Sequence, residues 1–254
     1  MKDSLPNLCL ESADSYSMNS NLTLPCAAAG PPAQSPCPHY TTRQASRILA
    51  GLDSPVPQQS QETFVSRYPF PDLNTLPEDI RTRILEVQEK AGFIPNVFLA
   101  FARRPAEWRA FFAYHDALML KEEGSLTKGE REMIVTATSA ANQCLYCVVA
   151  HGAILRIYEK KPFVADQVAV NHRKADISPR QRAMLDFAMK VCLRSQEIAD
   201  ADFEALYPHG FDDEDIWDIA AITAFFGLSN RMASFAGMQP NPEFYLMGRV
   251  PKQK

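Results

Sequence analysis

Two cysteines and a histidine lie within the eight residues "CLYCVVAH", numbered 144–151. In a helix, Cys147 and His151 share one face at i and i+4, and Cys144 lies one turn before Cys147. Backbone N–H groups at a helix N-terminus favour a thiolate, and a neighbouring imidazole can accept a proton. Both effects lower the pKa of a cysteine from about 8.5 toward neutrality. The segment therefore predicts a reactive pair of thiols.

A carboxylate, Glu132, lies twelve residues before Cys144. In one unbroken helix the two residues would be about 18 Å apart and could not act together. A bend at Asn142 and Gln143 would instead pack two helices side by side and bring Glu132 to the thiols and to His151. We expect the second helix to begin near Gln143, with Cys144 in its first turn. Because the flanking residues are mostly apolar, a carboxylate there needs a partner.

Other interpretations of the C-x-x-C pair are a zinc site and two small buried side chains. Cys144, Cys147 and His151 supply only three ligands, and no second C-x-x-C or H-x-x-H pair completes a tetrahedral structural site. We therefore expect no metal. Cys192 lies on an apolar helical stripe, which is typical of a buried inert thiol.

The composition limits the class of protein. The 254 residues are 46% hydrophobic and 22% charged, with a net charge of -4. A chain without a basic surplus is a poor binder of nucleic acid or anionic membranes, and no apolar run reaches the roughly 20 residues of a spanning helix. The cysteines form no disulfide framework and no signal-peptide core is present, so we expect a reducing cytoplasmic location.

Residues 1–62 differ from the rest of the chain. They are rich in Ser, Pro, Gln and Asn, as in "LDSPVPQQSQ", and have too little periodic apolar content to form a core. We predict a disordered N-terminal tail. Between Asp14 and Asp53 the tail lacks acidic residues but contains arginines, which resembles a transit peptide, so mitochondrial targeting is the alternative.

From Leu76 onward the apolar spacing is helical, and strand alternation is nowhere sustained, so the fold class is all-α. The stretch "LPEDIRTRILEVQEKAG" begins with Pro77 and acidic residues and stops at Gly92. Asn96 is a candidate N-cap for a short helix that ends before Pro105. A further helix follows through "AEWRAFFAYHDALML", and the helix "CLYCVVAHGAILRIY" is apolar nearly all round.

Two later segments start in the same way, at Thr127 followed by Glu130 and at Ser178 followed by Gln181. A hydroxyl residue with Glu or Gln three positions later is a capping box that opens a helix. The similarity has two explanations, an internal duplication of a helical unit or independent capping.

The spacing of the candidate residues resembles that of a known family. Eleven residues separate Glu132 from Cys144, the first cysteine of the C-x-x-C pair, and three separate Cys147 from His151. This pattern is similar to that of the AhpD-like alkyl hydroperoxidases of the carboxymuconolactone decarboxylase superfamily, and within them to that of a peroxidase-related branch. The phrases "GFIPNVFLAF", "REMIVTATSAANQCLYCVVAHG" and "NRMASFAGMQPNPEFYLMGR" resemble that branch too. The resemblance implies one AhpD-like helical domain over residues 68–250.

The resemblance also implies roles. Cys147 would attack a hydroperoxide as the thiolate and become a sulfenic acid, and Cys144 would condense with it to a disulfide. His151 would take the thiol proton and Glu132 would orient His151. The implied cycle uses no cofactor apart from the redox-active disulfide, and needs an external protein or small-molecule dithiol as reductant. In the bacterial enzymes a histidine lies between the cysteines, where this chain has Tyr146, a candidate for that part of the relay.

Two other functions stay open beside the thiol peroxidase. Decarboxylases of the superfamily share the helical fold but do not rely on a C-x-x-C pair. A non-catalytic helical protein would use the fold only to oligomerise. In each case the apolar C-x-x-C helix and the resemblance lead us to expect a homo-oligomer.

Overall fold

The computed structural model describes residues 64–249. All of these residues belong to one compact unit. The predicted disordered tail, residues 1–62, lies outside the described residues, as does residue 250 at the end of the predicted domain.

The described residues form helices and no strand, which confirms the all-α prediction. The helices are α2 Glu78–Ala91, α3 Asn96–Ala102, α4 Pro105–Met119, α5 Lys128–Ala141, α6 Leu145–Glu159, α7 Val164–Asn171, α8 Pro179–Arg194, α9 Asp200–Glu204, α10 Asp213–Phe235 and α11 Glu243–Leu246. No helix in this range is both long and apolar enough to cross a bilayer.

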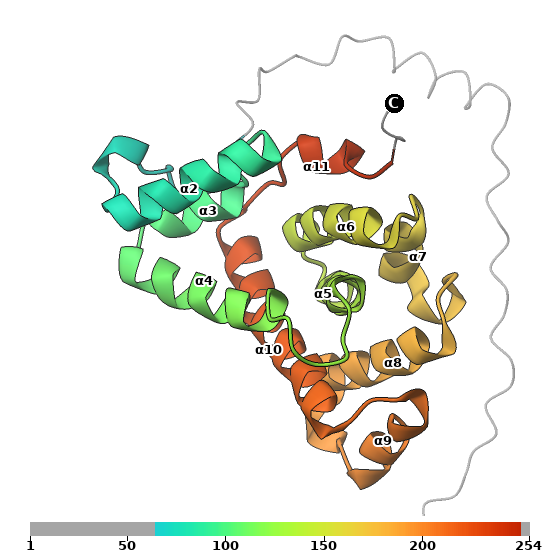
Figure 1. Ribbon diagram of the computed structural model, residues 1–254. Helices are drawn as coiled ribbons and strands as arrows, with labels where there is room; N and C mark the ends of the chain where they lie inside the picture. Colours follow the sequence, from blue (N-terminus) through green and yellow to red (C-terminus); the bar gives the residue numbers. More distant parts are fainter. Residues whose placement is uncertain (1–63, 250–254) are drawn as a thin grey trace, which may run out of the picture. The chain divides into compact units, whose positions relative to one another are not determined.

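Helix α5 is the central element. Figure 1 shows it end-on, with α6, α7, α8 and α10 around it, and all four contact it. Residues 129–139 are all buried, and Met133, Ile134 and Val135 have no exposed surface. Because α5 is covered on every side, its polar residues, including Glu132, lie inside the core and need partners there.

The predicted capping boxes open two of the helices. At α5, Thr127 Oγ1 accepts a hydrogen bond from the Glu130 N–H, and Glu130 accepts one from the Thr127 N–H. At α8, Ser178 and Gln181 make the same pair of bonds. Both predictions are confirmed, and these caps fix where α5 begins and hence the register of its side chains.

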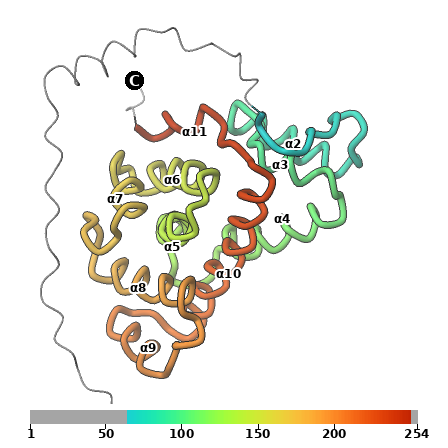
Figure 2. Tube along the Cα trace, turned by 180° about the vertical axis from the view of Figure 1, so that it is seen from behind, coloured from blue at the N-terminus to red at the C-terminus, as the bar shows by residue number. Residues whose placement is uncertain are grey.

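Helices α2, α3 and α4 form an aromatic cluster of their own around Trp108 and Phe112, beside the C-terminal half of α10 (Figure 2). Gly92 ends α2 in the left-handed conformation, φ 86°, as predicted. Asn96 is not an N-cap, because Pro95 holds that position. The side chain of Asn96 instead donates to the Gln239 carbonyl, which ties α3 to the segment after α10.

Candidate functional site

A tight turn joins α5 to α6 and places the first cysteine. Gln143 adopts a left-handed backbone, φ 54°, and the Cys144 N–H returns to the Ser139 carbonyl. The expected bend is confirmed, and α5 and α6 pack side by side. The predicted helix start was early: α6 begins at Leu145, and Cys144 is its N-cap rather than part of the first turn. Because Gln143 is left-handed and Cys144 is extended, helical geometry resumes only at Leu145.

Cys144 and Cys147 are both free thiols, each only 1% exposed. The sulfur of Cys147 lies 3.8 Å from the Ser229 hydroxyl on α10. Other residues of the same buried cluster surround the thiols: Tyr146, Ala150, Ala153, Ala233, Met238 and Phe244. The dithiol is therefore held at the N-terminus of α6, inside an apolar environment.

Glu132 and His151 form the second half of the site. The Oε2 atom of Glu132 is 2.7 Å from Nδ1 of His151, and these side chains are 7% and 13% exposed. An ionised carboxylate only accepts, so Nδ1 is the donor of this bond, and in the neutral form of the imidazole the lone pair is on Nε2. The ring of Phe226 packs edge-on against the imidazole, with 4.7 Å between centroids. Within residues 64–249 no hydrogen bond joins this imidazole to either thiol.

The two thiols influence each other's ionisation. Hydrogen bonding with the Cys147 thiol lowers the pKa of Cys144 to about 6, against the effect of burial. The same interaction raises the pKa of Cys147 well above its usual range, and burial and the negative charge on Cys144 add to the rise. Near neutral pH the pair therefore holds one thiolate and one thiol proton between its two sulfurs.

Two polar residues of α10 belong to the site but were not singled out from the sequence. Asn230, 1% exposed, donates to the Ser139 hydroxyl at 2.8 Å and accepts from the Asn142 side chain at 2.9 Å. It also lowers the pKa of both cysteines by hydrogen bonding, while Ser229 lies next to Cys147. The available signal in the sequence was the polar stretch 229–231, which interrupts the apolar part of α10.

Tyr146, the candidate for a second relay residue, lies between the cysteines in the chain but has another partner. Its hydroxyl accepts a hydrogen bond from the Val97 N–H at 3.1 Å, and the residue is 4% exposed. Burial raises the pKa of Tyr146 far above its usual value. The structure thus places this hydroxyl at the start of α3, where it connects α3 to α6.

Cys192, expected to be a buried inert thiol, is half-buried on α8, and its sulfur lies 3.9 Å from the Thr138 carbonyl. Burial raises its pKa, which disfavours the reactive thiolate at neutral pH. Across the part of the chain that the structure describes, no three His, Cys, Asp or Glu side chains form a group that could hold a metal ion.

A family model and several solved structures match the chain. The model of the carboxymuconolactone decarboxylase family matches residues 105–161, a range that contains Glu132, both cysteines and His151. No match was found among curated proteins.

Several solved structures are similar to the chain. A peroxidase-related protein from Ralstonia eutropha JMP134, titled an alkylhydroperoxidase AhpD core, is 79% identical, with 74% of this chain and 98% of that chain covered and a TM-score of 0.73. A peroxidase-related protein from Silicibacter sp. TM1040 is 41% identical, with 75% and 100% covered and a TM-score of 0.71. The debrominase Bmp8 shares the fold at 20% identity, with 73% and 96% covered and a TM-score of 0.57.

Proposed function

The chain belongs to the AhpD-like carboxymuconolactone decarboxylase superfamily, and from this premise we propose that it is a thiol peroxidase that reduces organic hydroperoxides. The observation that supports the proposal most is the buried dithiol of Cys144 and Cys147 at the start of α6, close to a hydrogen-bonded Glu132–His151 pair. Two free thiols one turn apart can form a disulfide without unfolding the helix. The site therefore has the groups for a two-electron reduction.

In the proposed cycle Cys147 reacts first. Its thiolate attacks the terminal oxygen of the hydroperoxide, the O–O bond breaks, and an alkoxide leaves and takes a proton to become an alcohol. Cys147 is now a sulfenic acid. The sulfur of Cys144 attacks that of Cys147, an S–S bond forms, and hydroxide leaves and is protonated to water. An external dithiol then reduces the disulfide and returns the enzyme to its first state.

The pKa values of the reduced protein define what the first step requires. The pKa of Cys144 is about 6, so the reduced pair already holds one thiolate at neutral pH. Cys147 keeps its proton at neutral pH because its pKa is raised, so its attack on peroxide needs a base. We assign that role to Nε2 of His151, with Glu132 as the positioning residue at Nδ1. The proton would pass through the incoming hydroperoxide or a water molecule.

We also propose that the protein assembles with further copies of itself. Helix α6 is apolar nearly all round, yet Leu145, Ile157 and Tyr158 remain 53%, 45% and 45% exposed in the single chain. Covering them with a second subunit would remove this apolar surface from water. Light scattering on the dilute protein should give a mass above one chain, and a fully stable monomer would contradict this part of the proposal.

Counting thiols before and after one equivalent of cumene hydroperoxide tests the proposed activity. A thiol peroxidase should lose two thiols per chain, and Cys147→Ser should lose none at this site. A decarboxylase or a purely structural helical protein should lose none in the wild type either. The result thus separates the proposed function from the two alternatives.

A further inference from the structure

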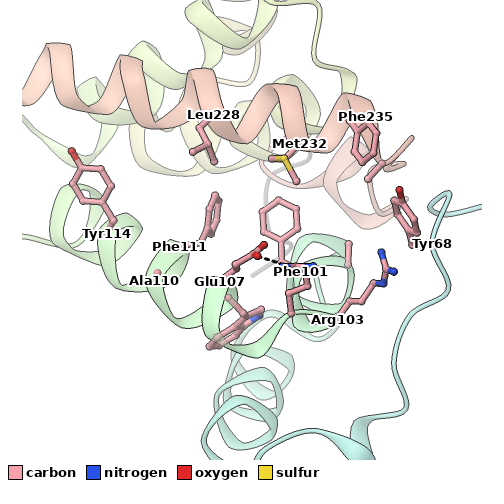
Figure 3. Close-up of a pocket in the computed structure, with 14 residues that line it drawn as sticks. Tyr68, Phe101, Arg103, Glu107, Ala110, Phe111, Tyr114, Leu228, Met232 and Phe235 are labelled. Atoms are coloured by element: carbon pink, nitrogen blue, oxygen red, sulfur yellow. Dashed lines mark hydrogen bonds and ion pairs between the residues drawn. The ribbon is translucent and has the colours of Figure 1, made fainter.

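An apolar groove of about 670 Å³ lies between α4, α10 and the end of α3 (Figure 3). On the α10 side Leu228, Met232 and Phe235 project toward it, and they are 54%, 41% and 59% exposed. Phe111 and Tyr114 of α4 face them. The volume falls in the range of about 300–1,000 Å³ that is typical of small-molecule sites, which are also mostly apolar.

The groove borders the buried cluster that contains the dithiol. Ala100 and Phe101 line the groove and also pack against the cluster that contains Cys144 and Cys147. Both thiols are 1% exposed, so a substrate needs a path to them. Phe101 is half-buried and is the largest side chain that the two sites share. Phe101 therefore lies at the boundary between the groove and the cluster that contains the thiols.

One end of the groove carries a cation. The guanidinium of Arg103 lies over the ring of Tyr68, 4.4 Å from its centroid, and within residues 64–249 it has no ion-pair partner. The neighbouring Arg104 is paired with Glu107, so these two charges offset each other. Figure 3 shows Arg103 beside Tyr68 at this end, while the Glu107 pair lies along the α4 wall. The groove thus combines apolar walls with one positive end.

We propose that this groove binds a long-chain fatty acid hydroperoxide, with the carboxylate at Arg103 and the hydrocarbon chain between α4 and α10. This rests on the proposed function and names the substrate class for it. The reaction is the same two-electron step: the fatty acid hydroperoxide becomes the hydroxy acid, water is released, and the dithiol becomes a disulfide. The groove lies between two helices and, among the described residues, has one unpaired cation at its end. A narrow ligand with a hydrocarbon chain and one carboxylate fits this shape and charge better than the broad surface of a second copy of the chain does.

Binding can be measured without any reaction, by fluorescence titration of the full chain with cis-parinaric acid and with its uncharged methyl ester. Arg103→Gln should weaken binding of the acid about tenfold, the effect of losing one charge-assisted hydrogen bond. Binding of the ester should not change. Ala110→Trp, which fills the groove from α4, should weaken both ligands at least tenfold. Ala113→Trp, also exposed on α4 but outside the groove, is the matched control.

Kinetics then links the groove to the dithiol. Ala110→Trp should lower the ratio of kcat/KM for linoleic acid hydroperoxide to kcat/KM for hydrogen peroxide at least tenfold, and Ala113→Trp should not. If the wild type consumes hydrogen peroxide but does not bind parinaric acid, the groove proposal is overturned while the proposed function stands. If parinaric acid binds at the groove and no peroxide is consumed, the proposed function fails and with it the assignment of a hydroperoxide. Dissociation of an oligomer by Ala110→Trp without any parinaric acid binding would show a subunit interface instead and would overturn the proposal.

Discussion

Replacing Cys147 by alanine should raise the pKa of Cys144. In the wild type that pKa is lowered from 9.0 to about 6, and the largest cause is the hydrogen bond that the Cys147 thiol donates. Alanine removes the donor but keeps the backbone N–H at position 147 and the side chains of Ser234 and Asn230, which also lower the pKa. We expect a value between these limits, well above that of the wild type.

A rate at one pH would hide most of this effect. With a pKa of about 6, Cys144 is ~90% thiolate at pH 7, whereas with a pKa near 9 it is ~1% thiolate. A thiolate of higher pKa is also more nucleophilic, and with a Brønsted coefficient of about 0.4–0.5 it reacts roughly 15- to 30-fold faster. The two effects largely cancel, so alkylation at pH 7 would fall only about three- to sixfold. The pH midpoint is therefore the quantity to measure.

The assay is the rate of iodoacetamide alkylation of Cys144 from pH 4 to 10, followed by mass spectrometry so that other cysteines do not contribute. Cys147→Ser is the matched control, because a serine hydroxyl can still donate to the Cys144 sulfur. Its midpoint should stay closer to the wild type than that of Cys147→Ala. A midpoint near pH 6 in all three proteins would refute the shared proton and leave the helix N-terminus as the cause of the lowered pKa.

Three further predictions concern the reaction. In Cys144→Ser, oxidation by hydroperoxide should stop at a sulfenic acid on Cys147, which dimedone traps. Cys147→Ser should give no dimedone adduct at this site. The opposite result would mean that Cys144 is the thiol that attacks the hydroperoxide. Glu132→Gln should slow oxidation of Cys147 at neutral pH by about 10- to 100-fold, since a buried charged hydrogen bond is worth about 1.5–3 kcal/mol. The exposed Glu122→Gln is its control, and an unchanged stopped-flow rate in Glu132→Gln would remove the carboxylate from the mechanism. Tyr146→Phe leaves the Val97 N–H of α3 without its acceptor. Urea denaturation should therefore show a free energy of unfolding that is lower by about 1–2 kcal/mol. A slower oxidation of Cys147 in this variant would show that the hydroxyl takes part in the relay.

The parts of the site that lie close in sequence could be predicted. Cys147 and His151 are four residues apart, so helical periodicity alone puts them on one face of α6. The approach of Glu132 needed one more inference, a bend near Gln143, and the 2.7 Å contact with His151 confirms it. The capping boxes were predictable for the same reason, since each uses residues three positions apart.

The contribution of α10 could not be predicted in this way. Asn230 meets Asn142 across 88 positions of sequence, and nothing local in the α10 run indicates which face turns toward the thiols. The N-cap prediction for Asn96 was wrong for a related reason. The side chain of Asn96 donates its hydrogen bond to the Gln239 carbonyl, which is distant in sequence. Contacts with residues distant in sequence decide the position of both side chains, and they overrode a local preference at Asn96.

The central claim is that Cys144 and Cys147 reduce a hydroperoxide together. The most direct measurement treats the fully reduced protein with one equivalent of cumene hydroperoxide, then quantifies cumyl alcohol and maps disulfides by mass spectrometry. We expect one cumyl alcohol for each Cys144–Cys147 disulfide formed. Consumption of hydroperoxide without this disulfide, or no consumption while both thiols stay reduced, would contradict it.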